Sequence, residues 1–245
     1  MRRSICYDGA KGGGNMERKK LSQEGLKLIA CVTMLLDHIG AALVPYPGLR
    51  VIGRLAFPIY CFLLAEGAAR TGSPKKYTLR LAAGALLSEI PFDLLFFGSM
   101  TWAHQSVMVT LLLGLFAVFA MERVRALPVK LLVTVPFVLA AELLGTDYGG
   151  YGVWMAALFA LTRQMPDGKL LQAAGLAALC WLIGGYRITL GPLRVPIEMF
   201  AMFSLIPISL YSGRKTTSSR VIQWIFYLFY PVHMAVLLAI LQLLF

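Results

Sequence analysis

Long apolar runs, interrupted by short groups of Gly, Pro and charged residues, dominate the hydrophobic pattern of the chain. A helix needs about 20 mostly apolar residues to cross a bilayer, and runs near this length recur along almost the whole sequence. Breakers such as Pro45, Gly98 and Pro128 separate them. The pattern predicts an all-α polytopic membrane protein with about nine transmembrane helices in one bundle, at residues 24–44, 51–69, 78–97, 107–122, 127–144, 148–163, 169–186, 195–212 and 221–244.

The positions of the basic residues predict how this bundle lies in the membrane. Of the 23 Lys and Arg residues, 19 lie in the N-terminal segment or in every second connection after it. Because short basic loops stay in the cytoplasm, the N-terminus is expected to be cytoplasmic. With an odd number of helices, the C-terminus is expected to be extracytoplasmic, in a bacterial cytoplasmic (inner) membrane. Four arginines depart from this rule and fall on the outer side: Arg50, Arg54, Arg187 and Arg194.

Composition supports the membrane class and limits the partners. Hydrophobic residues make up 58% of the chain and charged residues only 14%, with a mean hydropathy of +0.72. Residues 21–245 are expected to form a single transmembrane domain. Residues 1–20 are expected to be a disordered cytoplasmic tail, with Met16 as an alternative native start. The net charge of +11 is explained by topology and by attraction to anionic membrane lipids, so no nucleic-acid partner is expected.

Several other polar residues have a structural interpretation. The four cysteines have no paired spacing, so we interpret them as small buried residues without a disulfide or metal role: Cys6, Cys31, Cys61 and Cys180. The three histidines are scattered, and no metal site is predicted. Glu66 lies four residues before Arg70, the spacing of a local helix pair.

Ionisable side chains gather in the half of the predicted bundle that faces away from the cytoplasm. This half holds Asp37, His38, Glu89, Asp93, His104, Glu142, Asp147, Glu198 and His233. Charges inside a membrane persist when they are paired or when they line a wet functional cavity. In the first interpretation, Arg50 and Arg54 hold helices together through ion pairs. Their partners would be Glu89 and Asp93 of the third predicted helix. In the second, the assembly is a site where chemistry occurs.

Lys27 and His38 lie on one face of the first predicted helix. They are eleven residues apart, very nearly three turns, which separates them by about 16 Å. This length suits an extended thiol-bearing arm, such as the pantetheine of coenzyme A with its phosphates near Lys27. A neutral imidazole is well suited to removing a proton from an amine or hydroxyl, so His38 is the candidate catalytic base. Asp37, Glu89 and Asp93 are the candidates for holding its tautomer.

Six segments of the chain resemble the TraX family of membrane proteins, named for the N-acetyltransferase of conjugative F pilin. They are GLKLIACVTMLLDHIG, RVIGRLAFPIYCFLLAEG, KYTLRLAAGALLSEIPFDLLFFG, TLLLGLFAV, AELLGTDYGGYGV and FYLFYPVHM. TraX in turn is similar to the transmembrane acyltransferases, including acyltransferase family 3. The resemblance implies transfer of an acetyl group from cytoplasmic acetyl-CoA to an amine or hydroxyl on the extracytoplasmic side. It also implies a pilin N-terminus or an envelope glycan as acceptor, and it allows a homodimer.

The resemblance further implies roles for individual residues. Family 3 members have a basic residue and a catalytic His with ten residues between them, and Lys27 and His38 have this spacing. Lys27 would bind the acyl donor. Arg50 and Arg54 would stabilise the oxyanion or hold a coenzyme A phosphate, although three residues separate them where family 3 arginines have two. The further candidates for orienting His38 or binding the acceptor are Glu89, Asp93, Asp147, Tyr148, Tyr230 and His233.

Two rival functions remain open at the level of sequence. A proton-coupled secondary transporter would use the intramembrane acids and His38 as a proton relay. Transporters of that kind tend to have two related halves, and the sequence has no internal repeat. The other rival is a non-catalytic membrane partner in pilus or envelope assembly.

Overall fold

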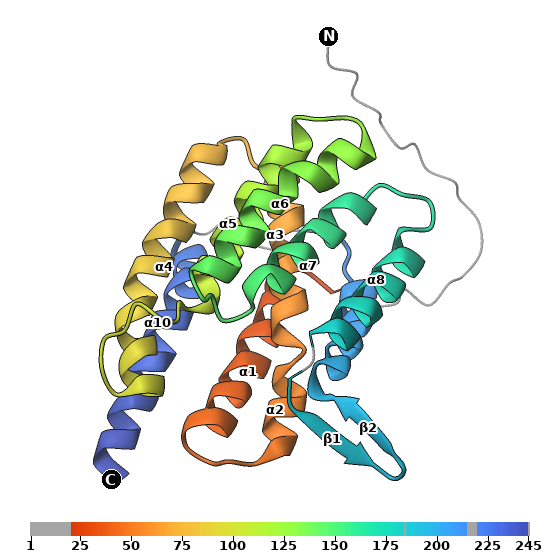
Figure 1. Ribbon diagram of the computed structural model, residues 1–245. Helices are drawn as coiled ribbons and strands as arrows, with labels where there is room; N and C mark the ends of the chain where they lie inside the picture. Colours follow the sequence, from red (N-terminus) through yellow and green to blue (C-terminus); the bar gives the residue numbers. More distant parts are fainter. Residues whose placement is uncertain (1–20, 184, 215–219, 245) are drawn as a thin grey trace, which may run out of the picture.

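The computed structural model describes residues 21–183, 185–214 and 220–244, which form a bundle of helices with one short β-hairpin (Figure 1). The helical fold class predicted from the sequence is confirmed. The elements, in chain order, are α1 (Gln23–Ala42), α2 (Pro47–Gly53), α3 (Ala56–Arg70), α4 (Pro74–Phe97), α5 (Val107–Glu122), α6 (Leu127–Leu143), α7 (Gly149–Thr162), α8 (Gly168–Leu182), β1 (Arg187–Leu190), β2 (Leu193–Pro196), the 3₁₀ helix η1 (Ile197–Ser204), α9 (Leu205–Ser209) and α10 (Arg220–Leu244). The expected tail, including Met16, lies outside the described residues.

The second predicted helix is two helices, α2 and α3, separated by a turn at Arg54 and Leu55. Pro58 explains the break, because it lies in the first turn of α3, lacks an N–H and would press its ring against the carbonyl of the residue four positions earlier. That residue is Arg54. The break therefore places the Arg54 side chain at a bend and not in the middle of a continuous helix.

Residues 187–209 depart most from the predicted pattern. The sequence predicts helices at 169–186 and 195–212, but α8 ends at Leu182 and an antiparallel hairpin follows, with Arg187 opposite Pro196. Gly191, with φ of 60°, makes the turn. The β-branched residues on both sides of this Gly-Pro pair favour strands over a helix. The remainder of the predicted eighth span is the 3₁₀ helix η1 and the five-residue α9.

The core is formed where α3 packs against α1, α5 and α7. α10 lies along α4 on one side of the bundle, and α8 packs on α7 and η1 on the other (Figure 1). Fully buried apolar side chains from five helices fill the centre, among them Leu26, Ile59, Leu115, Met155 and Met234. This core brings α1, α2, α4 and α10, which are far apart in the sequence, around one region.

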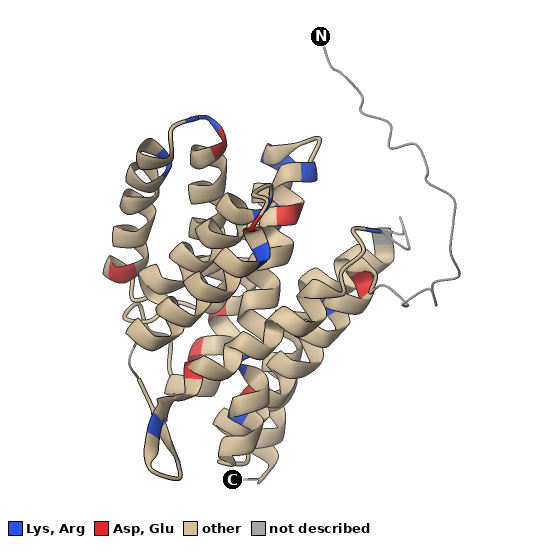
Figure 2. Ribbon diagram, turned by 90° about the vertical axis from the view of Figure 1, so that its right-hand side faces the viewer, with Lys and Arg blue, Asp and Glu red and all other residues tan. Residues whose placement is uncertain are grey.

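Three segments within the described residues are long and apolar enough to cross a membrane: Gln23–Ala42, Pro47–Arg70 and Val221–Leu244. Four shorter apolar helices accompany them. Leu86, Leu132 and Leu182 are largely exposed on the outside of the bundle, as expected of lipid-facing side chains. Figure 2 shows long stretches of helix surface without Lys, Arg, Asp or Glu. The protein is therefore a helical membrane protein, while nine spans and their orientation stay predictions.

Candidate active site

Two cavities meet inside the bundle. The first, called the Lys27 cavity, has a volume of about 390 Å³. Its polar and aromatic lining consists of Gln23, Lys27, Tyr60, Glu66, Arg70, Tyr77, Arg80, Tyr211, Gln223, Phe226, Tyr227 and Tyr230. The second, called the His38 cavity, has a volume of about 410 Å³. Its polar and aromatic lining consists of Asp37, His38, Arg50, Arg54, Phe57, Tyr60, Phe92, Phe96, Phe97, Asp147, Tyr148 and Glu198. Met34, Tyr60 and Val107 line both, so the cavities adjoin.

One face of α1 forms a wall of both cavities. The Ser22 hydroxyl accepts a hydrogen bond from the Gly25 N–H at 3.1 Å, which caps the helix just before Lys27. Lys27, Met34 and His38 follow at helical spacing along this face. Lys27 lines the first cavity, Met34 lines both, and His38 lines the second. The cation and the imidazole thus line two cavities that share part of their wall.

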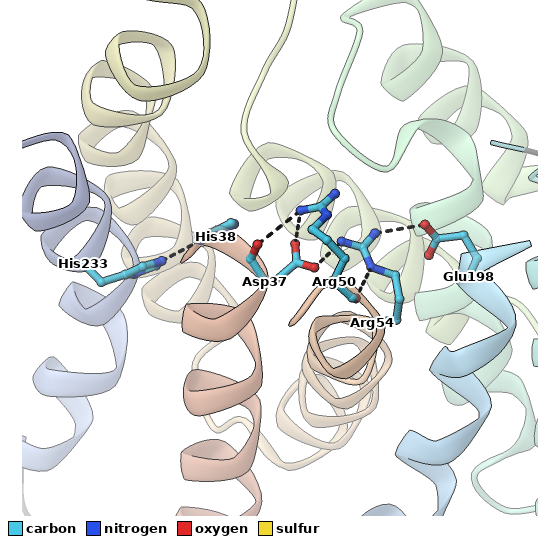
Figure 3. A network of polar contacts seen from close by, with 6 residues as sticks. All are labelled: Asp37, His38, Arg50, Arg54, Glu198 and His233. Atoms are coloured by element: carbon cyan, nitrogen blue, oxygen red, sulfur yellow. Dashed lines mark hydrogen bonds and ion pairs between the residues drawn. The ribbon is translucent and has the colours of Figure 1, made fainter. Parts of the chain in front are cut away.

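His38 is held by a second histidine. Its Nδ1 lies 2.7 Å from Nε2 of His233 on α10 (Figure 3). Nδ1 of His233 lies 2.7 Å from the carbonyl oxygen of Phe229. A carbonyl oxygen only accepts, so Nδ1 of His233 carries the proton and its Nε2 is the acceptor when the ring is neutral. His38 therefore donates from Nδ1. Its Nε2 keeps a free lone pair, which is the form of imidazole that can take a proton or attack a carbonyl.

Asp37, next to His38, belongs to a separate network of charges. Its carboxylate pairs with Arg50 at 2.7 Å and with Arg54 at 2.6 Å, and Arg54 also pairs with Glu198 of η1 at 2.9 Å (Figure 3). Gly53 permits this contact, since a Cβ there would lie 2.1 Å from the Asp37 carboxylate. The arginines are thus occupied by carboxylates. Glu198 lies outside the site predicted from sequence, which identified it only as one of the outer acids.

Glu89 and Asp93 do not form the predicted ion pairs with the two arginines. Glu89 instead accepts hydrogen bonds from the hydroxyl and the backbone N–H of Ser106, and Asp93 accepts one from the N–H of Thr101 at 2.8 Å. Both carboxylates therefore organise the connection between α4 and α5. The carboxylates accept these bonds because backbone N–H groups in the connection leading to α5 have no partner within a helix. His233, one of the further candidates from the sequence, and not Asp37, Glu89 or Asp93, contacts Nδ1 of His38.

Asp147 and Tyr148 line the His38 cavity from the connection between α6 and α7. The backbone N–H of Asp147 donates to the carbonyl of Gln105 at 2.9 Å, and the Tyr148 ring stacks on Phe57 with centroids 3.7 Å apart. The Asp147 residue is exposed at the cavity. Desolvation by the neighbouring protein raises its pKa to about 6, and Arg54 only partly offsets this rise.

The Lys27 cavity carries the second group of cations. Lys27 Nζ lies 5.2 Å from the centre of the Phe226 ring. Arg70 forms the predicted ion pair with Glu66 and donates to a backbone carbonyl at 2.8 Å. Nε of Arg80 is buried without a hydrogen-bond partner among the described residues. From the sequence, Arg80 is only one of the basic residues expected on the cytoplasmic side. Its position within two turns of Pro74 on α4 brings it into the cavity wall.

The cysteines carry no catalytic arrangement. Cys31, Cys61 and Cys180 are buried and free, and Cys31 Sγ lies 3.2 Å from the Tyr60 hydroxyl. Cys6 lies outside the described residues. Within the described ranges, no group of three His, Cys, Asp or Glu side chains is placed to hold a metal ion. His38 and the Tyr60 hydroxyl both line the His38 cavity, so an imidazole base is available there.

Comparison with known proteins shows the family to which the chain belongs. The chain is 32% identical over 230 residues to a probable fimbrial assembly protein, FimC of serogroup H1, from Dichelobacter nodosus, covering 86% of this chain and 92% of that protein. No solved structure matches. The profile of the family described as TraX protein matches residues 22–241. On this match and on the FimC likeness, the chain belongs to the TraX family.

Proposed function

We propose that the protein is a membrane acetyltransferase that moves an acetyl group from cytoplasmic acetyl-CoA to an amine or hydroxyl on the extracytoplasmic side. The observation that carries this proposal is that His38 lines a cavity that adjoins the Lys27 cavity through Met34, Tyr60 and Val107, and that its Nε2 has no hydrogen-bond partner among the described residues. A base that takes a proton from an incoming nucleophile needs such access from two directions. An imidazole with a purely structural role would be surrounded by packed side chains.

The Lys27 cavity is suited to the acyl donor. Its cations Lys27 and Arg80 would bind the phosphates of acetyl-CoA by charge and hydrogen bonding. The apolar and aromatic remainder of the wall would hold the pantetheine arm. From Lys27 to His38 the helix rises by about 16 Å, so a pantetheine arm of this length would bring the acetyl thioester to the imidazole. Arg50 and Arg54 line the other cavity and are held by carboxylates, so we assign them no phosphate-binding role.

The His38 cavity is suited to the acceptor. It would receive an amine or hydroxyl, and Nε2 of His38 would take the proton of the attacking group as the new bond to the carbonyl carbon forms. His233 would keep His38 in the required tautomer through the Nδ1 hydrogen bond. The likeness to a fimbrial assembly protein favours a pilus subunit as acceptor. An envelope glycan meets the same chemical requirement.

The test is label transfer from radioactive acetyl-CoA by the purified protein in detergent, offered a peptide amine and a sugar hydroxyl in parallel. The variants are His38→Ala and, as a matched control, His104→Ala, since His104 is exposed and lines neither cavity. Transfer that survives in His104→Ala and falls by about 10² to 10⁴-fold in His38→Ala supports the proposal. Full transfer in His38→Ala overturns the role of His38. Solute flux without coenzyme A in proteoliposomes would favour a transporter instead.

A further inference from the structure

Tyr230 carries a hydroxyl that the fold buries without an acceptor for its proton. The residue is 3% exposed, and its Oη has no hydrogen-bond partner among the described residues. It lies on α10, one residue before Pro231. A buried tyrosine hydroxyl normally finds a partner, because leaving one unpaired is costly. The unpaired Tyr230 hydroxyl is therefore a candidate for a functional hydrogen bond.

The hydroxyl lies near the point where the two cavities adjoin. The Tyr230 ring is 5.8 Å from the His38 ring and 5.5 Å from the His233 ring, edge to face in both cases. Its oxygen faces the backbone N–H of Val107, the first residue of α5, which lines both cavities. A backbone N–H can only donate. Any bond from Val107 therefore leaves the proton of the Tyr230 hydroxyl free to be donated elsewhere.

The two arginine side chains near His38 already pair with carboxylates. Arg54 pairs with Asp37 and Glu198, and Arg50 pairs with Asp37. Redirecting Arg54 to a new anion would leave Glu198 unpaired in an apolar environment, which is costly, and Arg50 is held by Asp37. The Tyr60 hydroxyl lies 3.2 Å from Cys31 Sγ, and either atom can be the donor. Tyr230 is a buried tyrosine beside His38 whose hydroxyl has no acceptor among the described residues.

We propose that Tyr230 donates a hydrogen bond to the oxyanion that forms during acetyl transfer, an inference that rests on the proposed function. The acceptor nitrogen or oxygen forms a bond to the carbonyl carbon of the thioester, and the carbonyl π pair moves to oxygen. Nε2 of His38 takes the proton of the attacking group. The oxyanion, stabilised by the Tyr230 hydroxyl, then re-forms the carbonyl as the carbon–sulfur bond breaks. The leaving thiolate takes the proton back from His38, and Tyr230 keeps its own proton throughout.

The experiment compares Tyr230→Phe with Tyr151→Phe in acetyl transfer to a short peptide amine and to a monosaccharide. Tyr151 is a matched control, since its hydroxyl contacts Cys180 and it lines neither cavity. Loss of one oxyanion donor lowers kcat by about 10² to 10³-fold. We expect Tyr230→Phe to lose kcat on this scale while KM for acetyl-CoA changes less than about twofold, since ground-state binding is not affected. Tyr151→Phe should keep wild-type kcat.

A second variant distinguishes the effect of losing the hydroxyl from the effect of disturbing the fold. Replacing Tyr230 by 3-fluorotyrosine keeps the hydroxyl in place with a more acidic proton, so the protein should retain activity and kcat should respond to the acidity of the phenol. Wild-type kcat in Tyr230→Phe overturns the role of Tyr230 alone. Failure of 3-fluorotyrosine to keep activity in a folded protein also overturns it. An inactive wild-type protein overturns the proposed function, and the role of Tyr230 with it.

Discussion

The Nδ1 atom of His38 lies 2.7 Å from the Nε2 atom of His233, although 195 residues separate the two histidines in the chain. The rings are nearly parallel, with an angle of 7° and centroids 5.0 Å apart. In many hydrolases a carboxylate holds the catalytic imidazole. Here a neutral ring anchored to the Phe229 carbonyl has that position. The arrangement fixes the tautomer of His38 without adding a negative charge to an apolar region, where an unpaired charge would be costly.

This relationship predicts distinct effects for two substitutions of His233. His233→Phe keeps the ring stacking but removes the acceptor, so His38 loses its preferred tautomer. We expect kcat to fall by about 10²-fold, the lower end of what a general base contributes. His233→Gln restores an acceptor oxygen and should recover part of that loss. Steady-state kinetics with acetyl-CoA measure both, and equal activity in the two variants would show that packing, and not the hydrogen bond, is what His233 provides.

The charge network around Asp37 predicts unequal effects of the two arginines on stability. The Arg54 side chain is 8% exposed and pairs with two carboxylates, whereas the Arg50 side chain is 36% exposed. Removing one partner of a buried pair costs about 3–5 kcal/mol, and Arg50 remains to pair with Asp37, so Arg54→Met should cost about 3 kcal/mol. Arg50→Met should cost no more than about 1 kcal/mol. Unfolding in mixed detergent micelles measures the difference, and similar losses in both variants would contradict the network.

The Lys27 cavity predicts a defect in donor binding that topology alone would not cause. Lys27→Met and Arg80→Met should each raise KM for acetyl-CoA by about tenfold, the equivalent of about 1.4 kcal/mol. The effect should shrink at high salt, because it is electrostatic. Arg123→Met removes an exposed charge from the connection after α5, outside both cavities, and should leave KM unchanged. An equal rise in KM in this control would mean that only the overall charge matters.

The sequence predicts the helices well because lipid imposes a simple requirement on them. Every backbone group must be satisfied inside the hydrocarbon, so apolar runs bounded by Gly and Pro become helices. The face that joins Lys27 and His38 is likewise a local property of one helix. The hairpin at Arg187–Pro196 was not predicted, because helix assignment from hydropathy ignores the strand preference of β-branched residues.

The partners within the site could not be predicted in the same way. Charge type and depth indicated that Arg50 and Arg54 need acids, but several acids lie at the same depth. Which acid is chosen depends on the rotation of each helix and on close approaches such as that of Gly53 to Asp37. The role of His233 depends on the packing of α10 along α4, a contact between the end and the first half of the chain. Hydrophobic periodicity carries no information about such contacts.

Asp147 predicts a dependence of stability on pH with a definite sign. Its pKa is raised from 3.8 to about 6, so the folded protein holds this proton more tightly than the unfolded chain. Stability from this group is therefore complete below about pH 4 and is lost as the pH rises towards 6. The charged groups facing it are Arg50, Arg54, Asp37 and Glu198.

Asp147→Asn removes this titration while keeping the shape of the side chain. The free energy of unfolding of the wild type, minus that of Asp147→Asn, should therefore decrease between about pH 4 and pH 6 and stay level above that range. Asp167→Asn, at the opposite end of α7 and exposed, shows whether loss of any carboxylate produces the same slope. A difference that increases with pH would mean that the ionised Asp147 is stabilised by Arg54 more than burial disfavours it. In that case, Asp147 is a fifth member of the network formed by Asp37, Arg50, Arg54 and Glu198, and not a separate group.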